Sequence, residues 1–111
     1  MTKLCTIKLN KEFKTAYYHG KSFVHPLLIL YVRKNREKVC RIGITTGKKV
    51  GGAVQRNRCR RIIREAYRPF STKIGGHYDL VFVARTATAN STSTQLNTII
   101  GNMLKQAGLL V

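Results

Sequence analysis

The segment GAVQRNRCRRIIR, residues 52–64, constrains the fold of this chain more than any other. On an α-helix at 100° per residue, its apolar side chains and the following Ala66 and Tyr67 gather on one side. The other side is basic, with Glu65 as the interruption, and spans about 140° of the helix circumference. The segment therefore predicts a helix with one stripe to bury and one arginine face to expose. That face consists of Arg56, Asn57, Arg60, Arg61, Arg64 and Arg68.

The chemistry of this face indicates a phosphate-bearing partner. Guanidinium groups are planar, permanently charged and fork-shaped, so they match pairs of phosphate oxygens. The alternative is an ordinary solvated face, but such faces normally mix positive and negative side chains.

The length and net charge of the chain narrow the class of partner. The chain has 111 residues, enough for a single domain over 1–111, and 21 basic against 4 acidic residues give a net charge of +17. Such a charge calls for nucleic acid, an anionic membrane or an acidic protein. No apolar run approaches the roughly 18 residues of a membrane span, and the first ten residues lack the apolar core of a signal peptide. Cys5, Cys40 and Cys59 are too far apart to suggest a disulfide or a zinc site, so a cytoplasmic protein is expected.

Hydrophobic periodicity predicts a small two-layer α-β sandwich. Helices are expected over residues 11–18, from the glycines at 51–52 to about residue 68, and over 93–106. Strands are expected over 27–32, 39–46 and 78–84, with a short extra strand near 22–24 as an open alternative. The order is α-β-β-(β)-α-β-α, and the arginine helix should connect two parallel strands in this α/β (α+β) fold.

The sequence gives little support for a catalytic site in the protein itself. Its acids, Glu12, Glu37, Glu65 and Asp79, are scattered over the predicted elements, whereas a two-metal nuclease needs several convergent carboxylates. His19, His25 and His77 form no spaced pair, so neither a metal site nor a general base is expected.

Lys48 and Lys49 lie beside glycines directly before the arginine helix. Free backbone N–H groups and the positive helix end favour phosphate binding there. The spacing differs from that of a nucleotide-binding P-loop, so a nucleotide site is not expected.

GAVQRNRCRRIIR resembles the signature of the bacterial ribonuclease P protein subunit family, with its Gly-x-Ala-Val loop and Arg-Asn-Arg core. The segments FKTAYYHGKSF, LLILYV, Gly-Lys-Lys and Val-Ala-Arg extend the similarity over about residues 7–106. The resemblance implies an unusual left-handed β-α-β crossover around the arginine helix. It also implies a protein that assists a catalytic RNA in removing the 5′ leader of precursor tRNA. Its partners would be ribonuclease P RNA and precursor tRNA, with neither membrane nor DNA. Mg²⁺ would be held mainly by the RNA, with no organic cofactor.

The resemblance also implies roles for particular residues. Phe13, Tyr17 and Tyr31 match positions lining a cleft for the single-stranded leader. The positions that match the family's RNA-contacting motif are Arg56, Asn57, Arg58, Arg60, Arg61 and Arg64.

The residues themselves leave two interpretations of the aromatic group open. Phe13 and Tyr17 are i,i+4 neighbours, and Tyr31 lies in a strand that can pass beneath them. Aromatic planes beside cationic surface form a stacking platform for unpaired bases. They are equally common as core residues. Tyr17 should be the most exposed of the three, because Tyr18 can take the other face.

Two positions depart from the family pattern. Cys59 replaces an aliphatic residue, but it faces the predicted core, where a thiol behaves as a small apolar group. Gly52 stands where a side chain is more common, which loosens the expected helix start.

Two other functions remain as alternatives. A small basic ribosomal protein would share the size and charge but would not need an aromatic cleft. A sequence-specific DNA reader is less favoured, because no helix-turn-helix pair or zinc finger is present and uniform arginine favours phosphates over base edges.

Overall fold

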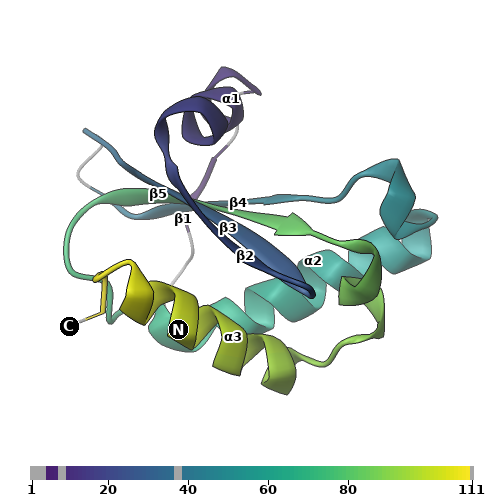
Figure 1. Cartoon of the computed structure of the whole chain (residues 1–111). Coiled ribbons are helices and arrows are strands. Elements are labelled where there is room, and N and C mark those ends of the chain that lie inside the picture. The colour runs from purple at the N-terminus through teal and green to yellow at the C-terminus, as the bar shows by residue number, and fades with distance from the viewer. Residues whose placement is uncertain (1–4, 8–9, 37–38, 111) are drawn as a thin grey trace.

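The computed structural model describes residues 5–7, 10–36 and 39–110. Its centre is a mixed sheet with the strand order β1-β4-β5-β3-β2, covered by helices on both faces (Figure 1). β4 is parallel to both of its neighbours, whereas β3 runs antiparallel to β5 and β2. The strands are β1 (Cys5–Thr6), β2 (Lys21–His25), β3 (Leu28–Lys34), β4 (Arg41–Thr45) and β5 (Tyr78–Ala84).

The α-helices of the described residues divide between the two faces of this sheet. α2 (Ala53–Tyr67) and α3 (Ser93–Gln106) lie side by side on one face, and α1 (Asn10–His19) lies on the other (Figure 1). Short 3₁₀ turns flank α2 and precede α3. They span Lys48–Val50, Arg68–Phe70 and Thr86–Asn90.

The predicted α-β class and order of elements are confirmed, and α1 adds a helix on the second face of the sheet (Figure 1). The optional strand is β2, which closes a hairpin with β3, and α2 connects the parallel neighbours β4 and β5. The two-residue strand β1 was not predicted from the sequence, because so short a segment carries no periodicity. The left-handed sense of the crossover stays a prediction of the family resemblance.

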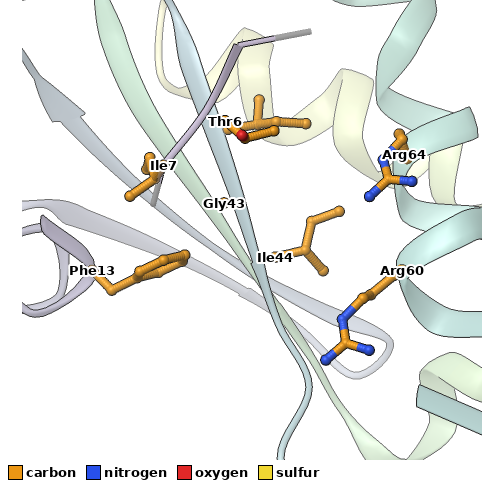
Figure 2. Close-up of a pocket in the computed structure, with 8 residues that line it drawn as sticks. Thr6, Ile7, Phe13, Gly43, Ile44, Arg60 and Arg64 are labelled. Atoms are coloured by element: carbon orange, nitrogen blue, oxygen red, sulfur yellow. The ribbon is translucent and has the colours of Figure 1, made fainter. Parts of the chain in front are cut away.

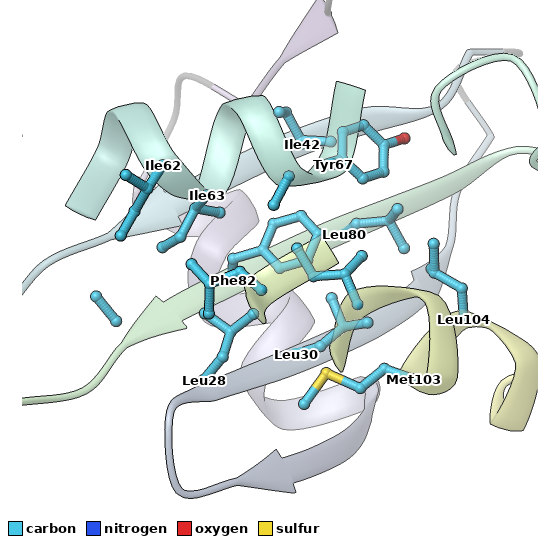
Figure 3. Close-up of a cluster of buried hydrophobic side chains, with 14 of the residues drawn as sticks. Leu28, Leu30, Ile42, Ile62, Ile63, Tyr67, Leu80, Phe82, Met103 and Leu104 are labelled. Atoms are coloured by element: carbon cyan, nitrogen blue, oxygen red, sulfur yellow. The ribbon is translucent and has the colours of Figure 1, made fainter. Parts of the chain in front are cut away.

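The main core lies between the sheet and the helices α2 and α3 (Figure 3). Leu30 and Phe82, from neighbouring strands, and Ile63 of α2 all belong to this core and are fully buried. Alternate strand residues face the other way, so Val81 belongs to a smaller cluster beneath α1 together with Ala16. The strong core therefore holds α2 in place, whereas α1 rests on a thinner apolar contact.

The start of α2 depends on a glycine pair. Gly51 adopts φ 137°, a conformation that other residues rarely take, and ends the preceding 3₁₀ turn. Gly52 is the N-cap and has an extended backbone, with no side-chain hydrogen bond to the first turn. The N–H groups that begin α2 are thus not capped by a side chain at position 52.

Cys59, the other departure from the family pattern, is fully buried as expected, and burial raises the pKa of its thiol.

The buried phenol of Tyr67 makes the free energy of unfolding fall at alkaline pH. Burial, with a smaller effect of Cys40, raises the pKa of the Tyr67 phenol above its ordinary value near 10. The corresponding stability is fully present below about pH 10 and is lost as pH rises toward the folded-state value. We expect Tyr67→Phe to lose less stability between about pH 9 and 12 than the wild type. Urea unfolding measured across this range tests it, and an equal loss in both proteins would contradict it.

Among the described residues, no helix is long and apolar enough to cross a membrane.

Candidate nucleic-acid interface

α2 presents its basic residues as the helical periodicity predicts. The stripe that includes Cys59, Ile62 and Ile63 is buried, and Ala66 and Tyr67 continue it. On the opposite side, three positions are exposed and three are half-buried. The exposed ones are Asn57, Arg61 and Arg64, and the half-buried ones are Arg56, Arg60 and Arg68. Arg68 begins the 3₁₀ turn that follows the helix. The arginine face of α2 is hereafter Arg56, Asn57, Arg60, Arg61, Arg64 and Arg68.

Arg58 lies apart from this face. Its Nε donates to the carbonyl oxygen of Ala89 at 2.9 Å, and one terminal nitrogen donates to the carbonyl oxygen of Ser91 at 3.2 Å. Both acceptors belong to the segment between β5 and α3. The side chain therefore ties α2 to that segment. The family resemblance, which groups Arg58 with the RNA-contacting residues, carries no sign of this internal role.

Other hydrogen-bonding groups shape the arginine face itself. Arg60 donates to the Oδ1 atom of Asn57 at 3.1 Å, which aligns the two side chains along the helix. The Nε atom of Arg56 is buried and has no hydrogen-bond partner within the described part of the chain. The exposed guanidinium groups of Arg61 and Arg64 can donate to external acceptors.

A pocket at the edge of the sheet brings the aromatic and arginine groups together. It has a volume of about 220 Å³ and opens where β1 stops pairing with β4. Figure 2 shows Phe13 on one side of β4 and the guanidinium groups of Arg60 and Arg64 on the other. Residues from β1, α1, β4 and α2 thus line one hollow. The full lining is Thr6, Ile7, Phe13, Ile42, Gly43, Ile44, Arg60 and Arg64.

The aromatic residues lie on the α1 face of the sheet. The Phe13 ring packs over Gly43, so closely that a Cβ atom at Gly43 would overlap it. Tyr17 is 36 % exposed, its ring meets Tyr31 edge-on with centroids 5.0 Å apart, and its hydroxyl donates to Thr45 Oγ1 at 3.4 Å. The burial fits the core interpretation in part, and stacking on unpaired bases stays a prediction. Phe13 and Tyr31 are half-buried and pack on the small cluster, yet Phe13 also lines the pocket.

As predicted, Tyr17 is the most exposed of the three, and Tyr18, 83 % exposed, takes the outer side of α1.

Lys48 and Lys49 are exposed at a second, larger hollow of about 520 Å³. Ile29 and Val83 line it as well, and so does Arg85, directly after β5. Arg85 belongs to the Val-Ala-Arg segment of the family resemblance, but the sequence does not predict its position beside the two lysines. Their proximity follows from the parallel pairing of β4 and β5, whose carboxyl ends reach the same edge of the sheet.

An ion-pair network lies between α1 and the sheet. Arg41 donates through Nε and one terminal nitrogen to the two carboxylate oxygens of Asp79, each at 2.9 Å. Its other terminal nitrogen donates to Glu12 at 2.6 Å. Asn35 adds a bond of 2.7 Å to Asp79, which is fully buried. Hydrogen bonding to Asp79, followed by that to Glu12, raises the pKa of the Arg41 guanidinium.

Glu12 and Asp79, which are far apart in the sequence, thus meet in the fold, but both bind the same arginine. Glu37 lies outside the described residues, and Glu65 is exposed on α2. Within residues 5–7, 10–36 and 39–110, no group of three His, Cys, Asp or Glu side chains is arranged to hold a metal ion. Of the histidines, His25 accepts a hydrogen bond from the Leu27 N–H, a structural contact in the turn between β2 and β3.

Comparison with known proteins gives one consistent result. The family model for ribonuclease P matches residues 1–108. A curated ribonuclease P protein component of Clostridium kluyveri is 46 % identical, covering 93 % of this chain and 94 % of that protein. That of Clostridioides difficile is 40 % identical, covering 95 % and 93 %.

Solved structures show the same similarity. The RNase P protein of Staphylococcus aureus superposes with a TM-score of 0.84 at 31 % identity, covering 98 % of this chain and 100 % of that one. The protein from Thermotoga maritima gives 0.79 at 26 % identity, with 91 % and 96 % covered.

Proposed function

The chain belongs to the ribonuclease P protein family, and we propose that it binds the catalytic RNA through α2 while holding the precursor tRNA leader against α1. It is the protein component of a ribonucleoprotein endoribonuclease, and its family works with ribonuclease P RNA. The alternative of a ribosomal protein has no support among the relatives.

The observation that carries the proposal is the pocket shared by Phe13, Arg60 and Arg64. A single-stranded nucleotide combines a planar base with a phosphate, and this hollow is lined by an aromatic ring on one side of β4 and by two guanidinium groups on the other (Figure 2). The rest of the arginine face of α2 continues from the pocket over exposed surface, where phosphates of a second RNA can bind. Tyr17 and Tyr31 extend the aromatic surface away from it. We leave Arg58 out of the RNA-binding set because it bonds to the protein backbone.

Lys48 and Lys49 complete the proposed binding surface at the other end. Both side chains are exposed beside Arg85 and the uncapped start of α2, an arrangement that favours phosphate binding. We assign them to RNA backbone contacts.

The leader contact is tested with Tyr17→Ala and Phe13→Leu in the complex assembled with ribonuclease P RNA. If the rings stack on leader bases, each variant should bind precursor tRNA more weakly by roughly 1–3 kcal/mol. Mature tRNA, which has no leader, should bind as before. Equilibrium affinities for the two tRNAs give the result, and Tyr18→Ala on the outer side of α1 is the matched control.

Urea unfolding of each variant separates binding from folding. Leucine keeps most of the apolar volume of Phe13, so we expect a stability loss below about 1.5 kcal/mol. Equal weakening toward both tRNAs would contradict the role of these rings in holding the leader and leave the arginine face to be judged separately.

We also propose that Mg²⁺ is held mainly by the RNA, and that this chain contributes no catalytic group. Of the described acids, Glu12 and Asp79 are paired with Arg41, and Glu65 is exposed and does not line the pocket. Alone, the protein should leave precursor tRNA uncut, and with ribonuclease P RNA it should increase cleavage at low Mg²⁺. A cleavage assay over a Mg²⁺ series, with each component alone and both together, tests this. Mg²⁺-dependent cleavage by RNA-free protein would overturn it.

The proposed compartment is the cytoplasm, because the free thiols of Cys40 and Cys59 suit a reducing environment.

A further inference from the structure

α1 contacts one face of β4 at three successive positions. Successive residues of a strand point to opposite faces of the sheet, so positions 41, 43 and 45 share the face toward α1. Arg41 donates a hydrogen bond to Glu12, and Thr45 accepts one from the hydroxyl of Tyr17. Between them Gly43 receives the ring of Phe13. The residues that bring α1 to the strand therefore include the two aromatic side chains that α1 contributes to the proposed leader surface, and Glu12, the neighbour of Phe13 in the sequence.

The apolar contact beneath α1 is small. Ala16 is the fully buried side chain of this helix, and Phe13 is half-buried. By contrast, several side chains of α2 and α3 are buried in the main core. A directional contact therefore contributes more to the position of α1 than it would for the other helices, because little shape complementarity restrains this helix.

The Arg41 end of the contact is rigid. Two parallel hydrogen bonds to a fully buried carboxylate fix the plane of the guanidinium group, and Asn35 fixes that carboxylate in turn. The third nitrogen of Arg41 consequently points in a set direction, where it meets Glu12. The network transmits the position of the β4–β5 pair to the helix that carries Phe13.

We infer that Arg41, held by Asp79, is a positioning residue that acts through Glu12 to hold Phe13 in the orientation that grips the leader. This inference rests on the proposed function. It gives the buried ion pair a role in substrate selectivity, in addition to its role in folding. Neither Arg41 nor Glu12 needs to touch RNA for this effect, since both act by fixing the helix.

The test substitutes Glu12, which leaves the buried Arg41–Asp79 pair in place. We expect Glu12→Ala to lower the affinity ratio of precursor to mature tRNA in the assembled complex by about two- to tenfold. Glu12→Gln keeps an acceptor for Arg41 and should recover part of the ratio. Glu65→Ala removes the same charge from exposed surface on α2 and should leave the ratio unchanged.

A double-mutant cycle with Phe13→Leu identifies the route of the effect. If Glu12 acts through Phe13, adding Glu12→Ala to Phe13→Leu should lower the ratio little further. Fully additive losses, or equal weakening toward both tRNAs after Glu12→Ala, would overturn the inference. The proposed function fails separately: in that case Phe13→Leu by itself leaves the ratio unchanged.

Discussion

Replacing Arg41 with alanine should destabilise the fold by about 3–5 kcal/mol, one of the two largest single effects we expect. The substitution leaves the Asp79 carboxylate fully buried without its bidentate partner, and the remaining bond from Asn35 does not neutralise the charge. Urea unfolding followed by circular dichroism measures the loss.

Arg33 provides a matched control at the same carboxylate. Its nearest nitrogen is 4.0 Å from Asp79, and its side chain is 37 % exposed, so Arg33→Ala should cost less than about 1 kcal/mol. Replacing the bidentate pair, as in Arg41→Met with Asp79→Leu, should recover much of the stability, because the fully buried carboxylate is then absent. Equal losses from Arg33→Ala and Arg41→Ala would show that the bidentate geometry is unimportant.

The second large effect concerns binding. Substituting alanine for Arg60, Arg61 and Arg64 together should weaken binding to ribonuclease P RNA roughly a hundredfold, at about 1 kcal/mol for each lost contact. If each residue neutralises one phosphate, the slope of log K against log salt should fall by roughly 2–2.7. The fold should remain intact, because none of the three belongs to the buried stripe of α2.

The control for this variant removes the same charge from other surfaces. Arg36, Lys73 and Lys105 are exposed and lie on three different parts of the chain. Their triple alanine substitution lowers the net charge by the same amount but removes no residue of the arginine face, so it should reduce the salt slope much less. The same slope in both variants would mean that general charge, and not the arginine face of α2, determines binding.

Sequence patterns predicted the helices and central strands because their information is local. The bounds of α3 and β5 match the predicted ranges, and those of α1, β3 and β4 differ by at most two residues at either end. In each case the apolar period along the segment is enough to identify the element. The buried stripe of α2 followed from the same reasoning.

The interior of the candidate site depends on contacts between distant segments, which no local pattern records. Arg41 and Asp79 are far apart in the sequence and meet because β4 and β5 pair in parallel register. The hydrogen bonds of Arg58 to Ala89 and Ser91 have the same origin in tertiary packing. From sequence alone, Arg58 and Arg60 are two basic residues of one helix, and only the fold distinguishes an internal bond from an available guanidinium.

The close packing of Phe13 on Gly43 has a consequence for how sequences of this family can diverge. A side chain at position 43 is compatible with the fold only if position 13 becomes smaller or α1 shifts away from β4. The two positions should therefore covary: relatives with alanine or a larger residue at 43 should lack a phenylalanine at 13. Since the ring also lines the pocket, a change at position 43 would alter the leader surface through Phe13. The residue at position 43 would then reflect selection for the leader surface, although glycine contributes no side chain to that surface.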